Sequence, residues 1–457
     1  MLIALLAIAF APVPAATAAP ADSAFATRAD RLGIPGGAVA HIDDGTVTRT
    51  EIFGHDGNGN PVNGATPFLW GSVSKPVAAA VVKRLADEGT LNLDAPASTY
   101  ADGAPDAPVG SLLDHTAGLG FGAELLDVDR PEATASEILA DPGVADSIAS
   151  TGGRPGEHHY SSLGYLVLQA VIEGATGGTY QDAVAATPGA MDVGASSGEC
   201  AGVPRGHRLA GPFAWPMDGG YDGAGAAYGY ACGSIGDLAE FAVSQLDSSV
   251  AAAARLEGTQ PTSAPHQLYG QGWRISAPET GPTTVWHTGT VPGYFSAIYL
   301  DPESGDGAVV LLNASGYLHE EVLAALTASA FGGNTAPPAG TGSEDEASGV
   351  GGMAVIVPAA LLGLALLALV LGWLGRRAVR ARTWVIGAVA VTAAALIAAP
   401  LLMGVPLRYF WLWEPGIVIA AAAIPVAMLI AAVMSVRGRR RRHPASPTSV
   451  GRQTPAD

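Results

Sequence analysis

Hydrophobic positions along the first 331 residues change from a two-residue period to a helical period and back. Residues 37–42 and 46–53 have the alternation and β-branched content of strands, and they flank Asp43-Asp44-Gly45, which is typical of a tight turn. Apolar residues at 78, 81, 82 and 85 have helical spacing, and Gly89 follows where such a helix would end. The pattern therefore predicts a hairpin followed by a helix.

Strand patterns return after a middle region that is rich in Gly, Pro and Ala. Helical patterns occupy 163–172, 235–246 and 319–331, and strand patterns occupy 272–276, 283–287, 294–300 and 307–312. Strands at both ends of a helical middle predict one sheet assembled from both ends of this region, with an inserted helical region.

Three uncharged apolar runs follow, at 353–375, 383–407 and 415–436, and each is long enough to cross about 30 Å of hydrocarbon. Arginines cluster after the first and third runs, whereas a single arginine lies with aromatic residues after the second: Arg376, Arg377, Arg380 and Arg382; Arg437 and Arg439 to Arg442; Arg408 with Tyr409, Trp411 and Trp413. The positive-inside tendency predicts three transmembrane helices in a lipid bilayer, a cytoplasmic tail at 437–457 and an extracytoplasmic region before residue 353. The runs contain no acid, lysine or histidine, which favours anchoring over transport.

The remaining boundaries follow from composition. Residues 2–10 are apolar and small residues continue to Ala24, so 1–24 reads as a signal-like segment, with a short buried segment as the alternative because no basic residue precedes the run. A folded domain is expected at 25–331. Residues 332–352 are rich in Gly, Pro, Ser and Thr and predict a flexible linker.

Charge divides the chain at the same place. Residues 1–352 carry 12 basic and 39 acidic side chains, whereas residues 353–457 carry 11 arginines and 2 acids, within a formal net charge of −18. The asymmetry indicates different surroundings for the two parts. An acidic surface repels phosphates, so we expect no nucleic-acid partner.

The chain has two cysteines, Cys200 and Cys232, and the sequence does not decide whether they form a disulfide. Outside the cytoplasm they can pair, which would stabilise the fold by about 3 kcal/mol, but two are too few for a disulfide scaffold. No Cys/His cluster has metal-ligand spacing, so we expect neither a zinc ion nor another cofactor.

A serine precedes a lysine by three residues at the start of the first predicted helix. The chain has two lysines, Lys75 and Lys83, and the first shares a helix face with Ser72. A serine hydroxyl needs an adjacent base, and a lysine acts as a base when burial lowers its pKa. The pair is a candidate nucleophile and base; a surface serine beside a solvated lysine is the alternative.

Further segments follow in a fixed order: Leu112-Leu-Asp-His-Thr-Ala-Gly-Leu119, Tyr160-Ser-Ser162 with Gly164-Tyr165, Gly233-Ser-Ile-Gly-Asp-Leu238, Tyr269-Gly-Gln-Gly-Trp273 and His287-Thr-Gly-Thr-Val-Pro-Gly-Tyr294. With Ser72-x-x-Lys75 they resemble the serine β-lactamase and penicillin-binding-protein superfamily, most closely its class C-like branch, which includes β-lactamases, D-Ala-D-Ala carboxypeptidases, D-aminopeptidases and esterases. The resemblance covers about residues 25–330. It implies an α+β fold with an antiparallel sheet flanked by helices.

The resemblance also implies roles for individual residues. Ser72 would be acylated, Lys75 would hold it in an activated network, and Tyr160 would act as general base and then acid, with phenolate character supplied by nearby positive charge. The backbone N–H groups of Ser72 and Thr290 would form an oxyanion hole, and the segment His287-Thr288-Gly289-Thr290 would align substrate. His115 is expected to be structural.

Two positions depart from the family pattern. Ser162 stands where the family has asparagine, and its shorter side chain would hold Lys75 less well or contact substrate differently. His287 stands where β-lactamases usually have lysine, and a neutral imidazole binds a carboxylate less strongly. Both departures argue against efficient β-lactamase activity.

The sequence therefore predicts a membrane-anchored extracytoplasmic serine hydrolase that cleaves an amide or ester through an acyl-serine intermediate. The expected substrates are D-amino-acid peptides, cell-wall peptides or small esters. A sensor of β-lactams or cell-wall peptides with little turnover is the alternative, although residues 437–457 contain no output domain. A degenerate scaffold is a third reading. The sequence leaves the oligomeric state open.

Overall fold

The fold is described from a computed structural model. It describes residues 24–120, 122, 130–149, 153–210, 213–246, 259–262, 264–279, 282–316, 319–331, 350–374, 379–403, 411–413 and 415–440. The predicted signal-like segment, apart from Ala24, most of the predicted linker and the end of the tail lie outside these residues.

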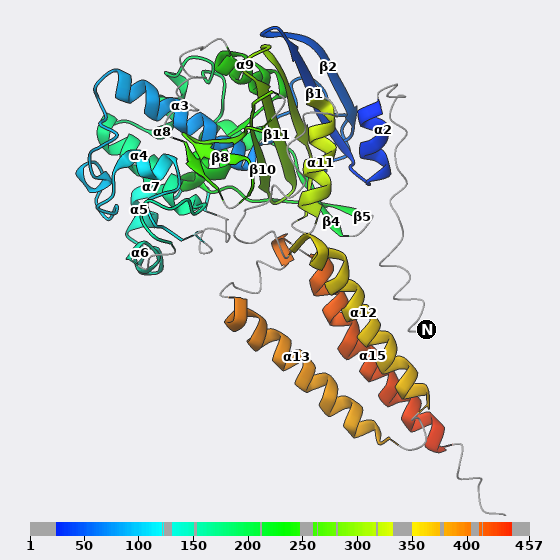
Figure 1. The fold of residues 1–457 in the computed structure, drawn as a ribbon. Coiled ribbons are helices and arrows are strands. Elements are labelled where there is room, and N and C mark those ends of the chain that lie inside the picture. The colour runs from blue at the N-terminus through cyan, green and yellow to red at the C-terminus, as the bar shows by residue number, and fades with distance from the viewer. Residues whose placement is uncertain are drawn as a thin grey trace, which may run out of the picture.

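An eight-stranded antiparallel sheet carries the folded domain (Figure 1). Its order is β2-β1-β12-β11-β10-β9-β8-β7, which joins the first strands of the chain to the last ones. The strands are β1 (Gly36–Asp43), β2 (Thr46–Gly54), β7 (Gln260–Pro261), β8 (Gln267–Gly270), β9 (Trp273–Ser276), β10 (Thr284–Val291), β11 (Tyr294–Asp301) and β12 (Asp306–Leu312). The predicted hairpin and the sheet built from both ends are therefore confirmed. The strand expected at 283–287 continues to Val291.

Two apolar cores lie on opposite faces of this sheet. Alternate residues of a strand face opposite sides, and accordingly Val309 and Leu311 belong to one core, whereas Val310 and Leu312 belong to the other. Helices α2 (Ala24–Arg31) and α11 (Glu320–Phe331) cover the smaller core. The larger core packs beneath α3 (Ser74–Asp87), α7 (Ser162–Thr176) and α9 (Ile235–Leu246).

The inserted helical region supplies the rest of the larger core. Its helices are α4 (Val109–Leu113), α5 (Ala135–Leu139), α6 (Pro142–Ala149) and α8 (Tyr180–Ala185), with short helical turns η1 (Gly71–Val73), η2 (Ala97–Thr99), η4 (Glu199–Gly202), η5 (Gly223–Gly225) and the π-helix η6 (Ala226–Tyr230). Two small sheets, β13-β4-β5 and β3-β6, complete it with β3 (Phe68–Leu69), β4 (Gly206–Ala210), β5 (Phe213–Met217), β6 (Cys232–Gly233) and β13 (Ala314–Ser315).

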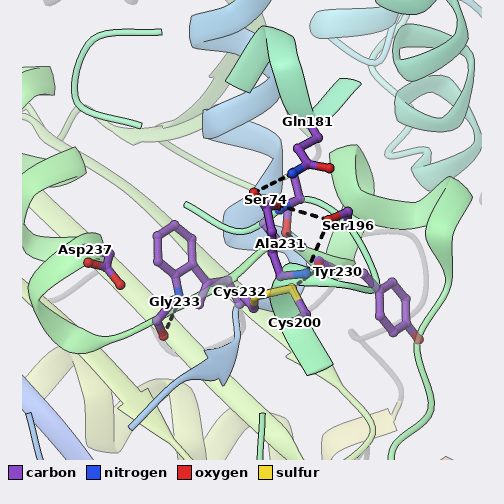
Figure 2. The surroundings of a disulfide bond; sticks show 12 residues. Ser74, Gln181, Ser196, Cys200, Tyr230, Ala231, Cys232, Gly233 and Asp237 are labelled. Carbon is purple, nitrogen blue, oxygen red and sulfur yellow. Dashed lines mark hydrogen bonds between the residues drawn. A yellow bond between two sulfur atoms is a disulfide. The ribbon is translucent and has the colours of Figure 1, made fainter. Parts of the chain in front are cut away.

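A disulfide joins Cys200 to Cys232, which decides the question that the sequence left open. Their Cα atoms lie 5.9 Å apart. Figure 2 shows the bond next to Tyr230 and Ala231, where the Ala231 N–H donates to Ser74 Oγ at 3.1 Å. The disulfide thus fixes the end of η6 beside the first turn of α3.

Three apolar helices follow the domain: α12 (Val350–Leu374), α13 (Ala381–Met403) and α15 (Pro415–Arg440). Residues 350–352, the last three of the predicted linker, belong to α12. Among the described residues, Pro415–Arg437 is long and apolar enough to cross a membrane, whereas Ala360–Leu374 and Ala381–Leu396 are shorter. Three membrane spans remain a prediction.

Candidate active site

Ser72 and Lys75 lie together where η1 passes into α3. Lys75 Nζ is 2.8 Å from Ser72 Oγ, as the helical spacing predicted. Ser72 is partly exposed and Lys75 is fully buried. The first turn of a helix also carries a partial positive charge, which stabilises negative charge that develops on the serine. The arrangement therefore places a partly exposed serine hydroxyl, the candidate nucleophile, next to a buried amine.

Two groups satisfy the Lys75 amine among the described residues: Ser72 Oγ and the carbonyl oxygen of Tyr228, each at 2.8 Å. Burial, and then the charge of Arg274, lower the pKa of Lys75 well below its usual 10.5. The Lys75 amine consequently loses its proton at a lower pH than the amine of an exposed lysine does, and a general base must be unprotonated.

Tyr160 completes the contact with the nucleophile. Its side chain is hydrogen-bonded to that of Ser72, and its ring centroid lies 5.0 Å from Lys75 Nζ. Burial raises the pKa of Tyr160 to about 12, although Arg274 and the Ser72 hydrogen bond lower it. Contrary to the phenolate character that we expected, Tyr160 is a neutral phenol near pH 7, because desolvation outweighs the nearby positive charge.

The start of α7 positions Tyr160. Ser161 is the N-cap: its hydroxyl accepts from the Gly164 N–H at 3.1 Å and its backbone N–H donates to His115 Nδ1 at 3.1 Å. His115 is 2% exposed and its ring packs 4.4 Å from that of Tyr160, which agrees with the structural role predicted for it. Ser162 is half-buried in the first turn, and among the described contacts it makes no hydrogen bond to Lys75.

Strand β10 approaches the nucleophile along the segment 287–290. A Cβ on Gly71 would lie 2.4 Å from the Thr290 nitrogen, and one on Gly289 would lie 2.7 Å from the Ser72 nitrogen. Gly71 also has a φ of +53°, so both positions require glycine. The two backbone N–H groups expected to form the oxyanion hole therefore belong to segments in direct backbone contact.

The His287 side chain is not open to substrate. It is 1% exposed, its Nδ1 lies 2.6 Å from the Thr288 carbonyl oxygen and its Nε2 lies 3.3 Å from the Tyr269 hydroxyl. A carbonyl only accepts, so Nδ1 carries the proton and Nε2 accepts from Tyr269. Burial and then Arg274 lower the pKa of His287 well below 6.5, so the ring is neutral. Thr288 is 8% exposed, and Thr290 Oγ1 donates to Glu320 Oε1 at 2.8 Å.

Sequence reasoning missed Arg274. This arginine on β9 is 4% exposed, and its guanidinium carbon lies 5.2 Å from the Tyr160 ring centroid and 5.5 Å from that of Trp286. Its Nε and Nη1 atoms are buried without a hydrogen-bond partner among the described residues. A signal was present: a charge inside an otherwise apolar strand pattern, directly after Tyr269-Gly-Gln-Gly-Trp273. Buried charges without partners are rare because they are costly, so this one indicates a site.

Comparisons with known proteins agree with this geometry. A family model described as Beta-lactamase matches residues 21–330. Penicillin-binding protein 4 of Amycolatopsis lactamdurans is 32% identical over 166 residues, and esterase EstB of Burkholderia gladioli is 35% identical over 163 residues. These alignments cover 33% and 31% of this chain and 41% of each relative, so the chain spans about two fifths of the length of these relatives.

A solved structure shows the same fold. The octameric penicillin-binding protein homologue from Pyrococcus abyssi superposes with a TM-score of 0.55 at 25% sequence identity. The match covers 64% of this chain and 72% of that protein.

Proposed function

Since this chain belongs to the beta-lactamase family, we propose that it is a serine hydrolase that cleaves an amide or ester bond through an acyl-Ser72 intermediate. The observation that carries the proposal is the 2.8 Å contact between Ser72 Oγ and a fully buried Lys75 amine. The names of a penicillin-binding protein and an esterase among its relatives support the same class of reaction.

Acylation begins with transfer of the Ser72 proton to the neutral Lys75 amine while Oγ bonds to the substrate carbonyl carbon. The carbonyl π electrons move to oxygen, and the Ser72 and Thr290 N–H groups stabilise this oxyanion. When the tetrahedral intermediate collapses, the bond to the leaving nitrogen or oxygen breaks. Tyr160, a phenol hydrogen-bonded to Ser72 in the free protein, donates its proton to the leaving atom, and the resulting phenolate takes up the proton that the Lys75 ammonium carries.

Deacylation repeats these steps with water. Water gives a proton to the Lys75–Tyr160 pair and its oxygen bonds to the acyl carbon. The bond to Ser72 Oγ then breaks, and Ser72 regains a proton. The acid is released and the protein returns to its starting protonation state.

Arg274 supports a finer assignment: a substrate with a free carboxylate. Its Nε and Nη1 atoms are buried without a hydrogen-bond partner among the described residues, in a region where Lys75, Arg274 and three histidines are near one another. A charge-assisted hydrogen bond from a guanidinium to a carboxylate that reaches it is strong where solvent is excluded. A peptide with a free C-terminus would satisfy these donors, whereas a neutral ester would leave them unpaired.

A hydrolysis panel on the full-length protein tests the function. A short-chain p-nitrophenyl ester, a D-Ala-D-Ala peptide and a chromogenic β-lactam are compared, with Ser72→Ala as the control and intact mass spectrometry to detect acyl adducts. We expect turnover that Ser72→Ala abolishes. A stable adduct without turnover would instead support a sensor, and no adduct with these substrates or a fluorophosphonate would sink the proposal.

We further propose that α12, α13 and α15 anchor the domain on the outer side of a membrane. The Arg clusters after the first and third apolar runs support this orientation. The Cys200–Cys232 disulfide supports an oxidising compartment. The Arg208 guanidinium carbon lies 5.6 Å from the Trp411 ring centroid, so the aromatic segment before α15 contacts β4 of the domain.

Cysteine labelling in whole cells tests the orientation. Val47 is 40% exposed on β2, and Ser446 lies in the predicted tail. A membrane-impermeant maleimide is expected to label Val47→Cys in intact cells. It is expected to label Ser446→Cys only after the cells are lysed. Labelling of both, or of Ser446→Cys first, contradicts this topology.

A further inference from the structure

The Lys75 amine depends on a partner that comes from far along the chain. One of its two hydrogen-bond partners, Ser72, lies on the same helical turn, but the other is the Tyr228 carbonyl of η6. Ser162, at the position of the family asparagine, makes no hydrogen bond to Lys75 among the described contacts. The placement of the Tyr228 carbonyl therefore decides how the amine is held.

The sequence of η6 does not fix that carbonyl by itself. A π-helix is a rare single turn that is less stable than an α-helix and is frequent at functional sites. The residues of η6 are Ala-Ala-Tyr-Gly-Tyr, and Gly225 precedes them. Small residues and glycine restrict the backbone weakly, so contacts from outside the turn must hold it.

A buried acid provides this contact. Asp222 is 0% exposed, and its Oδ2 accepts a short hydrogen bond from the Tyr228 hydroxyl and another from Arg130 Nη2 at 2.6 Å. Its Oδ1 accepts from the Ala224 N–H at 3.2 Å, which caps η5 just before η6. Gln169 adds a second tether through its Oε1, which accepts from the Ala227 N–H at 3.2 Å. Each end of the Tyr228 residue is thus held: the hydroxyl by Asp222 and the carbonyl by Lys75.

We propose that Asp222 is a positioning residue for acylation, which acts through the Tyr228 hydroxyl to hold the Tyr228 carbonyl against the Lys75 amine. The inference rests on the proposed function of Ser72 and Lys75. Arg130 neutralises the buried carboxylate, so it belongs to the same device. Loss of the hydroxyl bond lets η6 relax and admits water to the amine, which raises the pKa of Lys75 towards its ordinary value because burial is the main cause of its depression.

The other groups that face Lys75 must stay constant in a test. They are five residues at or beside four elements: Tyr160 before α7, Tyr165 on α7, His115 after α4, Arg274 on β9 and His287 on β10. The Tyr228→Phe variant alters none of them and leaves Asp222 paired with Arg130. Tyr230→Phe is a matched control, because this hydroxyl, two residues along the same π-helix, is buried and has no hydrogen-bond partner in the part of the chain that the structure describes.

The experiment measures the second-order rate of Ser72 labelling by a fluorescent fluorophosphonate between about pH 5 and pH 10 on the full-length protein. The wild-type rate should rise with pH as Lys75 loses its proton and then level off. In Tyr228→Phe the midpoint of this rise should shift to a pH about one unit higher. At pH values below the midpoint, the labelling rate should therefore be about tenfold lower than that of the wild type. Asp222→Asn should shift the rise in the same direction, and Tyr230→Phe should match the wild type.

Each result decides something different. The Tyr228→Phe curve could keep the wild-type midpoint and be lower only in proportion to the unfolded fraction that circular dichroism detects. This result overturns the positioning role and leaves Tyr228 with a structural role. A wild type that is never labelled overturns the proposed function and this inference with it. A shift in Tyr230→Phe equal to that in Tyr228→Phe also contradicts it, because the effect would then not depend on Asp222.

Discussion

The Lys75 amine lies between two helical segments that are specified in different ways. On one side, Ser72 in η1 and Lys75 in the first turn of α3 have the three-residue spacing that places them on one helix face. On the other side, η6 is an irregular turn whose carbonyl is placed by Asp222 and Gln169. The proposed nucleophile is therefore positioned by local spacing, whereas the protonation state of its proposed base depends on distant groups that bury it.

The largest effect is expected from a substitution of Lys75 itself, on the α3 side of the site. Lys75→Met should lower kcat/KM for a p-nitrophenyl ester by about 10³-fold or more, because it removes the base and leaves the rest of the site. It should also raise the melting temperature near pH 7. The unfolded chain binds a proton there that the folded Lys75 binds weakly, so the depressed pKa costs stability at pH values below 10.5 and the loss grows as pH falls.

Lys83→Met is the matched control for this variant. Lys83 lies on the same helix, has 36% of its side chain exposed and pairs with Asp87 at 2.8 Å. We expect wild-type activity and little change in stability, since exposed pairs contribute about 0–1 kcal/mol. Equal losses of activity in the two variants would show that Lys75 has no special role.

Tyr160→Phe should cause the next largest loss, about 10²-fold in kcat, since general acid–base residues contribute about 10²- to 10⁴-fold. Phenylalanine keeps the ring against Lys75 and Arg274, so the variant isolates the hydroxyl. Because protonation of the leaving group is the step affected, a poor leaving group such as an anilide should suffer more than p-nitrophenolate. Equal losses for the two substrates would remove the proton-donor role from Tyr160.

Arg274→Gln tests selectivity among substrates. We expect KM for a D-alanyl thioester with a thioglycolate leaving group to rise by about 10- to 100-fold, while the methyl ester of the same compound changes little, because a hydrogen bond to a charged group contributes about 1.5–3 kcal/mol. Released thiol is measured colorimetrically. If both compounds lose activity equally, Arg274 acts through Lys75 and Tyr160 rather than on the substrate.

The smallest effect on activity is expected for the double variant Cys200→Ser/Cys232→Ser. The bond closes a loop with a sequence separation of 32 residues, so its loss should lower the free energy of unfolding by about 3 kcal/mol. Below the melting temperature, activity should fall only a few-fold, because Asp222 and Gln169 still hold η6. Urea unfolding of both proteins measures the difference, and an unchanged midpoint would show that the bond contributes no stability.

Much of the fold follows from short-range pattern. The first hairpin follows from the alternation in residues 37–42 and 46–53 and from the turn between them. The later strands pair with it because their apolar faces must be buried in the same core. The patterns at 163–172 and 235–246 became α7 and α9. The end of β10 was missed because Gly289 interrupts the strand pattern with a residue of weak strand propensity, and pairing with β11 overrides that propensity.

Local sequence specifies the proposed nucleophile, the lysine three residues on, the tyrosine and the glycines that let β10 approach Ser72, since each depends on a local spacing or on a side chain that must be absent. The tertiary structure decided the protonation states and the partners. It buried Tyr160 so that it stays a phenol, buried the His287 ring against the Thr288 carbonyl and brought the Tyr228 carbonyl to Lys75. It also left Arg274 Nε and Nη1 without hydrogen-bond partners among the described residues. A pKa depends on the solvent and charge around a group, and those are fixed only when distant segments pack together.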